Sequence, residues 1–426
     1  AVECNQELNI IKKTASHCVE ETGGLFVGVR GDDERYIADF PKMCDASGIP
    51  YRSVDVRDAL EMEPALSPET IAVYEVNDAS INPFKLCIEN MKDVTEKGGT
   101  YISDCMLKGF EIEKGRITRS IVENRITGEI YHIQADSVIN ATGAWADHVA
   151  AMAGVTIHMV YSKGSLLVTS KRMTKRVINR LRKATDGDIL VPGGVVSILG
   201  TTSVRVDSPD NIYPTVDEVD HIINEGEQMI PELKRCRYVR AYSGVRPLVS
   251  LGGGDDRAVS RGFTLIDHEA DGVGNLITIT GGKLSTYRLM AEKTVDMVCR
   301  MHGVDAPCRT KEVLLPSTVS GEWSEPGTFF EVFKPASAFD APVDDPILCE
   351  CEMVPKSAVD EIVKDAPGRE GVMTLEAIAL RSRAGKGPCQ GSFCSLRIAS
   401  YLYDLGYYDD ETGLLHMRDF LNERFK

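Results

Sequence analysis

Short apolar runs alternate with amphipathic stretches along most of the chain, a pattern that predicts both strands and helices. Near the N-terminus, apolar residues at helical spacing precede the apolar run 24–29, which predicts a helix followed by a strand. Further helices are expected near 40–47, 174–181, 216–229 and 284–301, and further strands at 165–169, 195–200, 263–266 and 275–280.

Between residues 98 and 144, β-branched and aromatic runs are separated by turn residues, which predicts a meander of short strands. These strands are expected at 101–103, 109–113, 117–124, 129–134 and 137–140. The last one ends in the small residues Ala141, Thr142 and Gly143, where the backbone could approach a nucleotide closely. A strand-to-helix turn without any ligand would give the same pattern.

A second turn of this kind follows the apolar strand 275–280 and leads into a helix. Unpaired N–H groups at a helix N-terminus bind anions. In a flavoenzyme such a helix N-terminus can face the flavin. An ordinary capped junction between a strand and a helix is the alternative. The residues of this turn are Gly281, Gly282, Lys283, Leu284, Ser285 and Thr286.

Two arginines are candidates for binding an anion. Arg246 stands directly before Pro247 in an apolar run, an awkward place for a solvated charge, and Arg261 follows in the next segment. Together with Lys283 they could clamp a phosphate dianion, because arginine gives forked hydrogen bonds and lysine gives a point charge. Ordinary surface arginines are the alternative.

Four of the twelve cysteines form two close pairs near the C-terminus, Cys349 with Cys351 and Cys389 with Cys394. Four thiolates in a small module suit a [2Fe–2S] cluster. Structural zinc and unligated thiols are the alternatives. The other cysteines are scattered singly, as reduced thiols usually are, so a secreted disulfide scaffold is not expected.

Composition narrows the class of protein. The 426 residues are 43% hydrophobic and 26% charged, which is typical of a globular protein with two or three domains. Because 64 acidic residues outnumber 48 basic ones, for a net charge of -16, nucleic acid is not expected as a partner. The chain shows no signal peptide and no apolar run of the roughly 18 residues that a membrane helix needs. It is therefore expected in the cytoplasm, with any membrane attachment through a partner.

A stretch with five prolines at 316–346 predicts a linker, and helices are expected beyond it at 359–363, 375–380 and 395–405. Taken together, the motifs resemble the flavoprotein subunits of the anaerobic glycerol-3-phosphate dehydrogenases over essentially the whole chain. Each motif alone is weak, and the ordered set is specific. The matching segments are 17–20, 24–26, 78–83, 141–143, 163–167, 200–203, 244–248, 281–284, the cysteine pairs and 420–424.

The resemblance implies a fold like that of D-amino-acid oxidase. An α/β, Rossmann-like FAD-binding domain would be interleaved with an antiparallel β-sheet substrate domain, and a small helical [2Fe–2S] module like bacterioferritin-associated ferredoxin would follow. The implied boundaries are 1–154 and 262–315 for the FAD-binding domain, with some substrate-domain elements within 20–95, then 155–261 for the substrate domain, 316–346 for the linker and 347–426 for the module.

The resemblance also implies a reaction, the oxidation of sn-glycerol 3-phosphate to dihydroxyacetone phosphate by hydride transfer from C2 to N5 of FAD. Electrons would pass to a second flavin or iron–sulfur subunit, and a membrane-anchor subunit would reduce quinone. Arg246 and Lys283 would act at the reacting centre. The implied binding residues are Arg246, Arg261, Lys283 and Ser165 for the substrate, Ala141, Thr142, Gly143, Gly281, Gly282, Leu284, Ser285 and Thr286 for FAD, and Cys349, Cys351, Cys389 and Cys394 for the cluster.

One departure from the family pattern concerns the N-terminal side. The pattern begins with a strand, a G-x-G-x-x-G turn, an acidic residue and a basic, His-containing segment, none of which stands in this sequence. The chain is therefore expected to start inside the pattern and, by itself, to hold FAD weakly. No general base is assigned, because it could belong to that earlier part.

Two other functions stay open at the level of sequence. A different FAD-dependent oxidase or dehydrogenase, acting on an amino acid or a 2-hydroxy acid, would share the fold. An electron-transfer or assembly protein would keep the cluster and lack the flavin.

Overall fold

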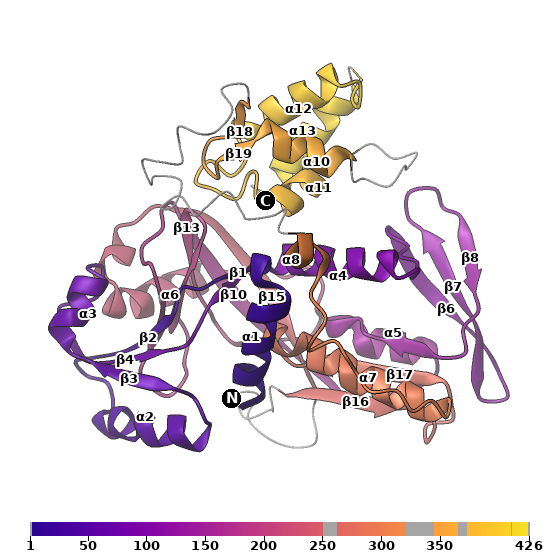
Figure 1. The fold of residues 1–426 in the computed structure, drawn as a ribbon, viewed down its shortest axis with the longest axis horizontal. Coiled ribbons are helices and arrows are strands. Elements are labelled where there is room, and N and C mark those ends of the chain that lie inside the picture. Colours follow the sequence, from indigo (N-terminus) through magenta and orange to yellow (C-terminus); the bar gives the residue numbers. More distant parts are fainter. Residues whose placement is uncertain (1, 250–261, 321–344, 365–372, 410, 425–426) are drawn as a thin grey trace.

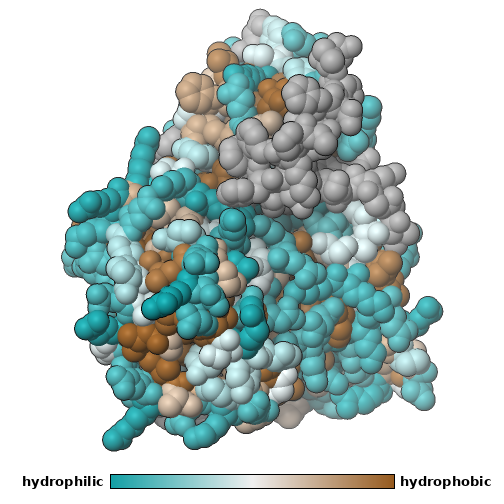
Figure 2. Space-filling view, turned by 60° about the vertical axis from the view of Figure 1, so that its left-hand side comes forward, coloured by the Kyte–Doolittle hydropathy of each residue, from teal (hydrophilic) through white to brown (hydrophobic). Residues whose placement is uncertain are grey.

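The computed structural model describes residues 2–249, 262–320, 345–364, 373–409 and 411–424. Figure 1 shows a large sheet with α2 and α3 at its outer edge, a second group of strands and helices beside it, and a helical module above both. Helix α1 (Val2–Thr14) runs through the middle of this view. The face in Figure 2 is mostly hydrophilic, with apolar residues in smaller patches among the polar ones.

Nine strands form the large sheet, in the order β14-β10-β13-β12-β11-β2-β4-β3, and β15 also pairs with β10. The pairing of β11 with β2 is parallel and the other pairings are antiparallel, so the sheet is mixed where an antiparallel one was expected. The strand bounds are β2 Gly24–Val29, β3 Tyr51–Val54, β4 Thr70–Val76, β10 Met159–Thr169, β11 Val177–Arg180, β12 Ile189–Gly193, β13 Val196–Gly200, β14 Val204–Val206 and β15 Tyr238–Val249.

Helix α6 (Val216–Met229) packs on this sheet. Its side chains Ile222 and Met229 share one buried core with Leu167 and Leu199 of the strands. Thr215 and Glu218 form a reciprocal capping box, which explains why the helix begins at this point.

Capping residues also define the helices that surround β2, β3 and β4. Asp33, Asp55 and Asn82 each accept a backbone hydrogen bond at the start of a helix, because the first N–H groups of a helix have no partner inside it. The bounds are α2 Glu34–Ala46, α3 Val56–Met62 and α4 Pro83–Glu96, with a short antiparallel pair formed by β1 Val19–Glu20 and β5 Ser80–Ile81.

A second sheet has the order β16-β17-β9, with β9 and β17 parallel. Strand β17 is buried over its first five residues, as expected of a strand covered on both faces. A three-stranded meander and two helices adjoin this sheet. The bounds are β6 Cys105–Glu113, β7 Arg116–Asn124, β8 Ile130–Ile133, β9 Val138–Asn140, α5 Ala146–Met152, β16 Phe263–Asp267, β17 Leu276–Gly281 and α7 Tyr287–Met301.

The C-terminal module has an apolar core of its own and lies at the top of the molecule in Figures 1 and 2. Arg383 of the module donates to the carbonyl of Gly193 at 3.0 Å, and Lys386 lies 4.5 Å from the ring centre of Phe84 on α4. These contacts dock the module on the rest of the chain. The bounds are α8 Pro316–Ser320 before it, then β18 Ile347–Cys349, β19 Val354–Pro355, α10 Lys356–Lys364, α11 Leu375–Ser382, α12 Cys394–Asp404 and α13 Thr412–Asn422.

Most of the elements expected from the sequence are confirmed, among them the strand 24–29, the helix 216–229 and most of the meander. Two expectations are wrong. Residues 174–181 contain strand β11 rather than a helix, because Val177 and Ile178 pair with β2 inside the sheet, and residues 101–103 form no strand. The domain boundaries stay a prediction, although β2, β3 and β4 do join the strands of 155–261.

Candidate active site

The carboxyl ends of β9 and β17 lie side by side. The strands are parallel, with Asn140 opposite Thr278, so both strands end at the same edge of the sheet. Strand β9 continues into the 3₁₀ turn η2 (Gly143–Trp145) and α5, and β17 into the 3₁₀ turn η4 (Leu284–Thr286) and α7. The Thr280 hydroxyl donates to the Gly143 carbonyl at 3.1 Å and joins the two turns. Ligands of open α/β sheets bind outside this edge.

The turn after β9 is held by the buried Asn140. Its amide donates to the carbonyl of Ala146 at 2.8 Å, and its Oδ1 accepts from the Thr142 hydroxyl at 2.7 Å. Gly143 has a φ of 60°, in the left-handed region that favours glycine. A Cβ on Gly143 would meet no described atom within 4 Å. The turn therefore leaves open space in which a ligand could lie against the backbone.

The two glycines of the turn after β17 are closely surrounded and have left-handed backbone conformations. Gly281 and Gly282 have φ values of 81° and 74°. A Cβ on Gly281 would lie 2.7 Å from the carbonyl oxygen of Gly262, and one on Gly282 would lie 2.5 Å from Sδ of Met290. A larger residue at position 281 would push the turn away from the backbone of Gly262. At position 282 the end of Met290 can move aside, and the left-handed φ is the stronger reason for glycine.

The start of the helix after this turn has both inward and outward side chains. Thr286 is buried, and its hydroxyl accepts from the Lys283 N–H at 3.2 Å and donates to the Lys283 carbonyl at 3.0 Å. Leu284 is exposed and Ser285 half-buried. Lys283 is exposed as well, and its Nζ lies 3.4 Å from Sγ of Cys4 on α1. The lysine charge therefore lies between α1 and the turn.

Arg246 on β15 is half-buried and held in place by its neighbours. Its Nη1 donates to the Thr202 carbonyl at 3.1 Å, and its Nη2 donates to the Thr201 hydroxyl. A Cβ on Gly164 would lie 2.6 Å from Nη2, so the guanidinium lies directly on the backbone of β10. These contacts fix the plane of the guanidinium.

Strand β15 connects Arg246 to the edge formed by the two turns. The carbonyl oxygen of Pro247, the next residue, lies 3.5 Å from the Cβ position of Gly281. Arg261 lies outside the described residues, and the Gly262 carbonyl that follows it contacts the same glycine. The structure thus brings three of the segments singled out in the sequence to one place.

Ser165 lies fully buried on β10. Its hydroxyl donates to Oε1 of Glu218 at 3.1 Å and hydrogen-bonds the Ser243 hydroxyl at 2.8 Å, and its N–H donates to the Thr202 hydroxyl at 3.0 Å. It belongs to a polar network that reaches Arg246 through Thr202. Its role in substrate binding stays a prediction.

The four C-terminal cysteines lie in two pairs. Cys349 lies near Cys394, and Cys351 lies near Cys389, close enough for each thiol to shift the pKa of its neighbour. The Cys394 thiol lowers the pKa of Cys349 to about 6, whereas burial and the Cys389 thiol raise the pKa of Cys351 to about 11. All four are free thiols. Within the described ranges, no three His, Cys, Asp or Glu side chains form a group that could hold one metal ion.

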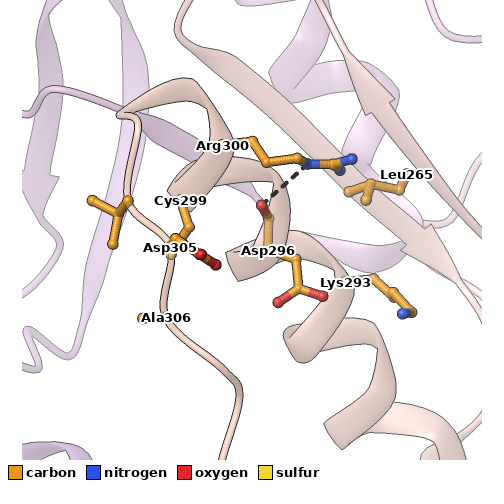
Figure 3. Close-up of a pocket in the computed structure, with 8 residues that line it drawn as sticks. Leu265, Lys293, Asp296, Cys299, Arg300, Asp305 and Ala306 are labelled. Carbon is orange, nitrogen blue, oxygen red and sulfur yellow. Dashed lines mark hydrogen bonds between the residues drawn. The ribbon is translucent and has the colours of Figure 1, made fainter.

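Two surface cavities lie away from the two turns and from Arg246. One of about 410 Å³ borders α7, and Figure 3 shows Arg300 of that helix donating to the backbone carbonyl of Asp296, at 3.3 Å. The other, of about 390 Å³, lies beside Lys12 and Asp78. Neither is lined by a residue of the turns, so the candidate site is defined by the strand ends and not by these cavities.

The sequence assigned no role in the site to Asn140, Thr202 or Glu218, although each makes a hydrogen bond to a predicted site residue. Only Glu218 leaves a readable signal, the Thr215-x-x-Glu218 capping pattern. That pattern predicts a helix start and does not reveal the contact with Thr202.

Residues 1–296 match the model of the DAO family, described as FAD dependent oxidoreductase. The chain belongs to this family. Its fold is accordingly the family's α/β fold, with an FAD domain and a β-sheet substrate domain. Among the described residues, no helix is both long and apolar enough to cross a membrane.

Relatives resemble the chain over its whole length, and two of them are named as subunits of anaerobic glycerol-3-phosphate dehydrogenases. The chain is 39% identical to the one from Escherichia coli (strain K12), of which it covers 81%. It is 33% identical to the one from Haloferax volcanii, of which it covers 76%. The resemblance expected from the motifs is confirmed.

Solved structures of low sequence identity share the fold. The glycerol-3-phosphate dehydrogenase from Bacillus halodurans complexed with FAD aligns with a TM-score of 0.66 and 19% identity, over 99% of this chain and 84% of the other. L-proline dehydrogenase from P. horikoshii aligns with a TM-score of 0.57 and 19% identity, over 75% and 83%. These likenesses concern the fold alone.

Proposed function

We propose that this chain is the flavoprotein subunit of an FAD-dependent glycerol-3-phosphate dehydrogenase. One observation carries the proposal: β15, the strand that carries Arg246, reaches the edge where the turns after β9 and β17 meet, with the Pro247 carbonyl oxygen 3.5 Å from the Cβ position of Gly281. Such a cation fits an anionic substrate beside a flavin. The similarity to two glycerol-3-phosphate dehydrogenase subunits, over the whole chain, supports this substrate.

The two turns fit FAD. Open space surrounds the Cβ position of Gly143. The start of the helix after β17 has N–H groups that could donate to an anionic edge of the flavin. Bound FAD would accept, at N5, the hydride that leaves C2 of sn-glycerol 3-phosphate as dihydroxyacetone phosphate forms. The residues proposed to hold it are Ala141, Thr142, Gly143, Gly281, Gly282, Leu284, Ser285 and Thr286.

The basic residues would bind and orient the substrate. Arg246 offers a planar fork of donors to two phosphate oxygens, and Arg261 would add a second fork. Lys283, exposed beside the turn, would supply a point charge close to the reacting carbon. Ser165 would support this pocket indirectly, because its N–H donates to the hydroxyl of Thr202.

We also propose that the module binds one [2Fe–2S] cluster through Cys349, Cys351, Cys389 and Cys394. Each iron of such a cluster takes two cysteine thiolates, whereas a structural zinc ion needs four ligands around one centre. The closeness of all four thiols, each of which shifts the pKa of its neighbours, supports a site that they share.

The partners follow from the proposed reaction. Electrons would leave through the cluster to a second flavin or iron–sulfur subunit, then to a membrane-anchor subunit, with quinone as the final acceptor. The names of both relatives describe them as subunits, which supports an assembly of several chains. We propose a cytoplasmic protein that is held at the membrane by these partners.

Substrate profiling of the FAD-loaded protein tests the proposal. Reduction of a dye is measured with glycerol 3-phosphate, glycerol, a 2-hydroxy acid and an amino acid. Rapid turnover is expected with glycerol 3-phosphate alone. Turnover with the hydroxy acid or the amino acid instead would assign the chain to another oxidase of the same fold, and iron without any flavin binding would indicate an electron-transfer protein.

A further inference from the structure

A buried carboxylate lies next to the segment that contacts Arg246. Glu218, the third residue of α6, is 9% exposed. Its Oε2 accepts from Nζ of Lys163 and from the Thr215 N–H, each at 2.8 Å. Its Oε1 accepts from the hydroxyls of Ser165 and Thr202, each at 3.1 Å. Both oxygens are therefore engaged by fixed donors.

The two oxygens of Glu218 serve different segments. Oε2 completes the capping box of α6 with Thr215. Oε1 reaches the segment between β13 and β14, where the Thr202 hydroxyl donates to Glu218 and the Thr202 carbonyl accepts from Nη1 of Arg246. Thr202 is thus a direct link between the buried carboxylate and the candidate phosphate-binding arginine.

The charge of Glu218 fixes the direction of these bonds. Burial alone would raise its pKa, but hydrogen bonds from Lys163, Thr215 and Thr202 outweigh burial and hold the pKa below its ordinary value. A charged carboxylate only accepts hydrogen bonds. The Thr202 hydroxyl must therefore donate to Glu218, and its oxygen is left to accept the N–H of Ser165 at 3.0 Å.

We propose that Glu218 is a positioning residue, which acts through Thr202 to hold the Arg246 guanidinium in the orientation that meets the phosphate of the substrate. The inference rests on the proposed role of Arg246. The Thr201 hydroxyl and the backbone at Gly164 restrict the same guanidinium from two other sides. Displacing the 201–202 segment would remove the carbonyl that aligns it.

A purely structural role for Glu218, as the cap of α6, predicts a different outcome. The cap depends on Oε2 and Thr215, whereas positioning depends on Oε1 and Thr202. Substitutions at the two threonines therefore separate the roles.

The test uses Thr202→Val, which removes the hydroxyl and keeps the shape, in the FAD-loaded protein. The Kd of glycerol 3-phosphate is measured by calorimetry, together with KM and kcat. We expect Kd and KM to rise about tenfold, as for the loss of one hydrogen bond to a charged group. The kcat should stay unchanged, because the phosphate contact serves ground state and transition state alike. Thr202→Ser should restore binding.

Thr215→Val is the matched control, since it removes a hydroxyl that bonds the other oxygen of the same carboxylate. It should lower the Tm and leave the Kd unchanged. An equal rise in Kd for Thr202→Val and Thr215→Val would mean that Glu218 only caps α6, and would overturn the inference.

A double-mutant cycle with Arg246→Ala separates the inference from the proposed function. In the Arg246→Ala background, Thr202→Val should cause no further loss of affinity, because the residue it positions is gone. Additive losses would overturn the positioning role and leave the phosphate-binding role of Arg246 intact. An unchanged Kd in Arg246→Ala itself would refute that phosphate-binding role, and the inference with it.

Discussion

Left-handed glycines occur in both turns of the site for two different physical reasons. At Gly281 a side chain would collide with the backbone carbonyl of Gly262, so packing requires glycine, whereas at Gly282 it would meet the movable end of Met290. At Gly143 a side chain would meet only open space, so packing inside the described chain does not require it. The left-handed φ of 60° already favours glycine at position 143, and the open surroundings leave room for a ligand to approach the backbone there.

This difference predicts the effect of Gly143→Ala. Forcing an alanine into the left-handed region costs about 1–2 kcal/mol, so the protein without cofactor should lose only that much stability. The added methyl group would occupy the space proposed for FAD, and we expect the Kd of FAD, measured by flavin fluorescence, to rise well beyond the change in stability. Gly154→Ala is the control, because Gly154 has a φ of 77° and open surroundings and lies after α5. Equal effects of both substitutions on FAD would contradict the prediction.

Arg261 offers a test of substrate charge. In the FAD-loaded protein, Arg261→Ala should weaken the binding of glycerol 3-phosphate far more than that of glycerol, by roughly 1.5–3 kcal/mol for one lost charge-assisted contact. Competition of each compound with the substrate measures the two losses. Arg240→Ala, near the start of β15, should change neither. An equal loss for both compounds would show that Arg261 does not bind the phosphate.

At the scale of elements, the sequence predicted best where local signals agreed. Helix α6 has the expected bounds because the Thr215–Glu218 capping box and the helical apolar spacing indicate the same start. Strand β11 was taken for a helix because the apolar residues around Val177 and Ile178 also fit a helical spacing, and a strand covered on both faces lacks the alternation that would identify it. Its partner β2 is far away in the sequence, so no local signal could decide.

The contact between α4 and α8 depends on one buried carboxylate. Ser317 donates to Glu89 through its N–H at 2.9 Å and through its hydroxyl at 2.7 Å, and His17 lies 3.4 Å from the same group. Burial would raise the pKa of Glu89, but the neighbouring His17 and the hydrogen bonds from Ser317 outweigh burial and lower it from 4.5 to about 2. The ionised group therefore stabilises the folded state.

The sign of the pKa shift sets the pH range of this stabilisation. Since the folded-state pKa is below the unfolded value, the contribution is complete above about pH 4.5 and is lost as the pH falls towards 2. Glu89→Gln should remove a pH-dependent contribution on the order of 3 kcal/mol. Denaturant unfolding between about pH 6 and pH 2 measures it. Glu96→Gln, at the exposed end of α4, should keep the slope of the wild type, and an identical slope for both variants would contradict the prediction.

At the scale of the whole molecule, the site could be predicted only in part. The turns after β9 and β17 were found because each joins a strand to a helix through glycine. Their approach to β15, the strand of Arg246, brings together segments far apart in the sequence, and β15 is itself held by its pairing with β10. The network of Glu218 depends on the same pairings, and its residues look like ordinary polar positions of separate segments.

The two-part architecture leads to the last prediction, which concerns Cys351→Ser. The cysteine pairs lie in a module with its own core, away from the turns proposed to bind FAD. Cys351 is paired with Cys389, so its loss should leave one iron with an incomplete ligand set. Iron in protein purified anaerobically should fall from two atoms per chain to a small fraction, and the module should unfold at a lower temperature, while the flavin absorbance stays unchanged.

Elemental analysis and the visible spectrum of the same sample decide this prediction. Cys105→Ser is the control, because Cys105 is a single, half-buried thiol at the start of β6. It should keep both the iron and the flavin. One zinc ion per wild-type chain would assign the thiols to a structural zinc site, and full iron content in Cys351→Ser would exclude Cys351 as a ligand. Loss of flavin together with iron would show that the module and the FAD site depend on each other, against the separate cores on which the prediction rests.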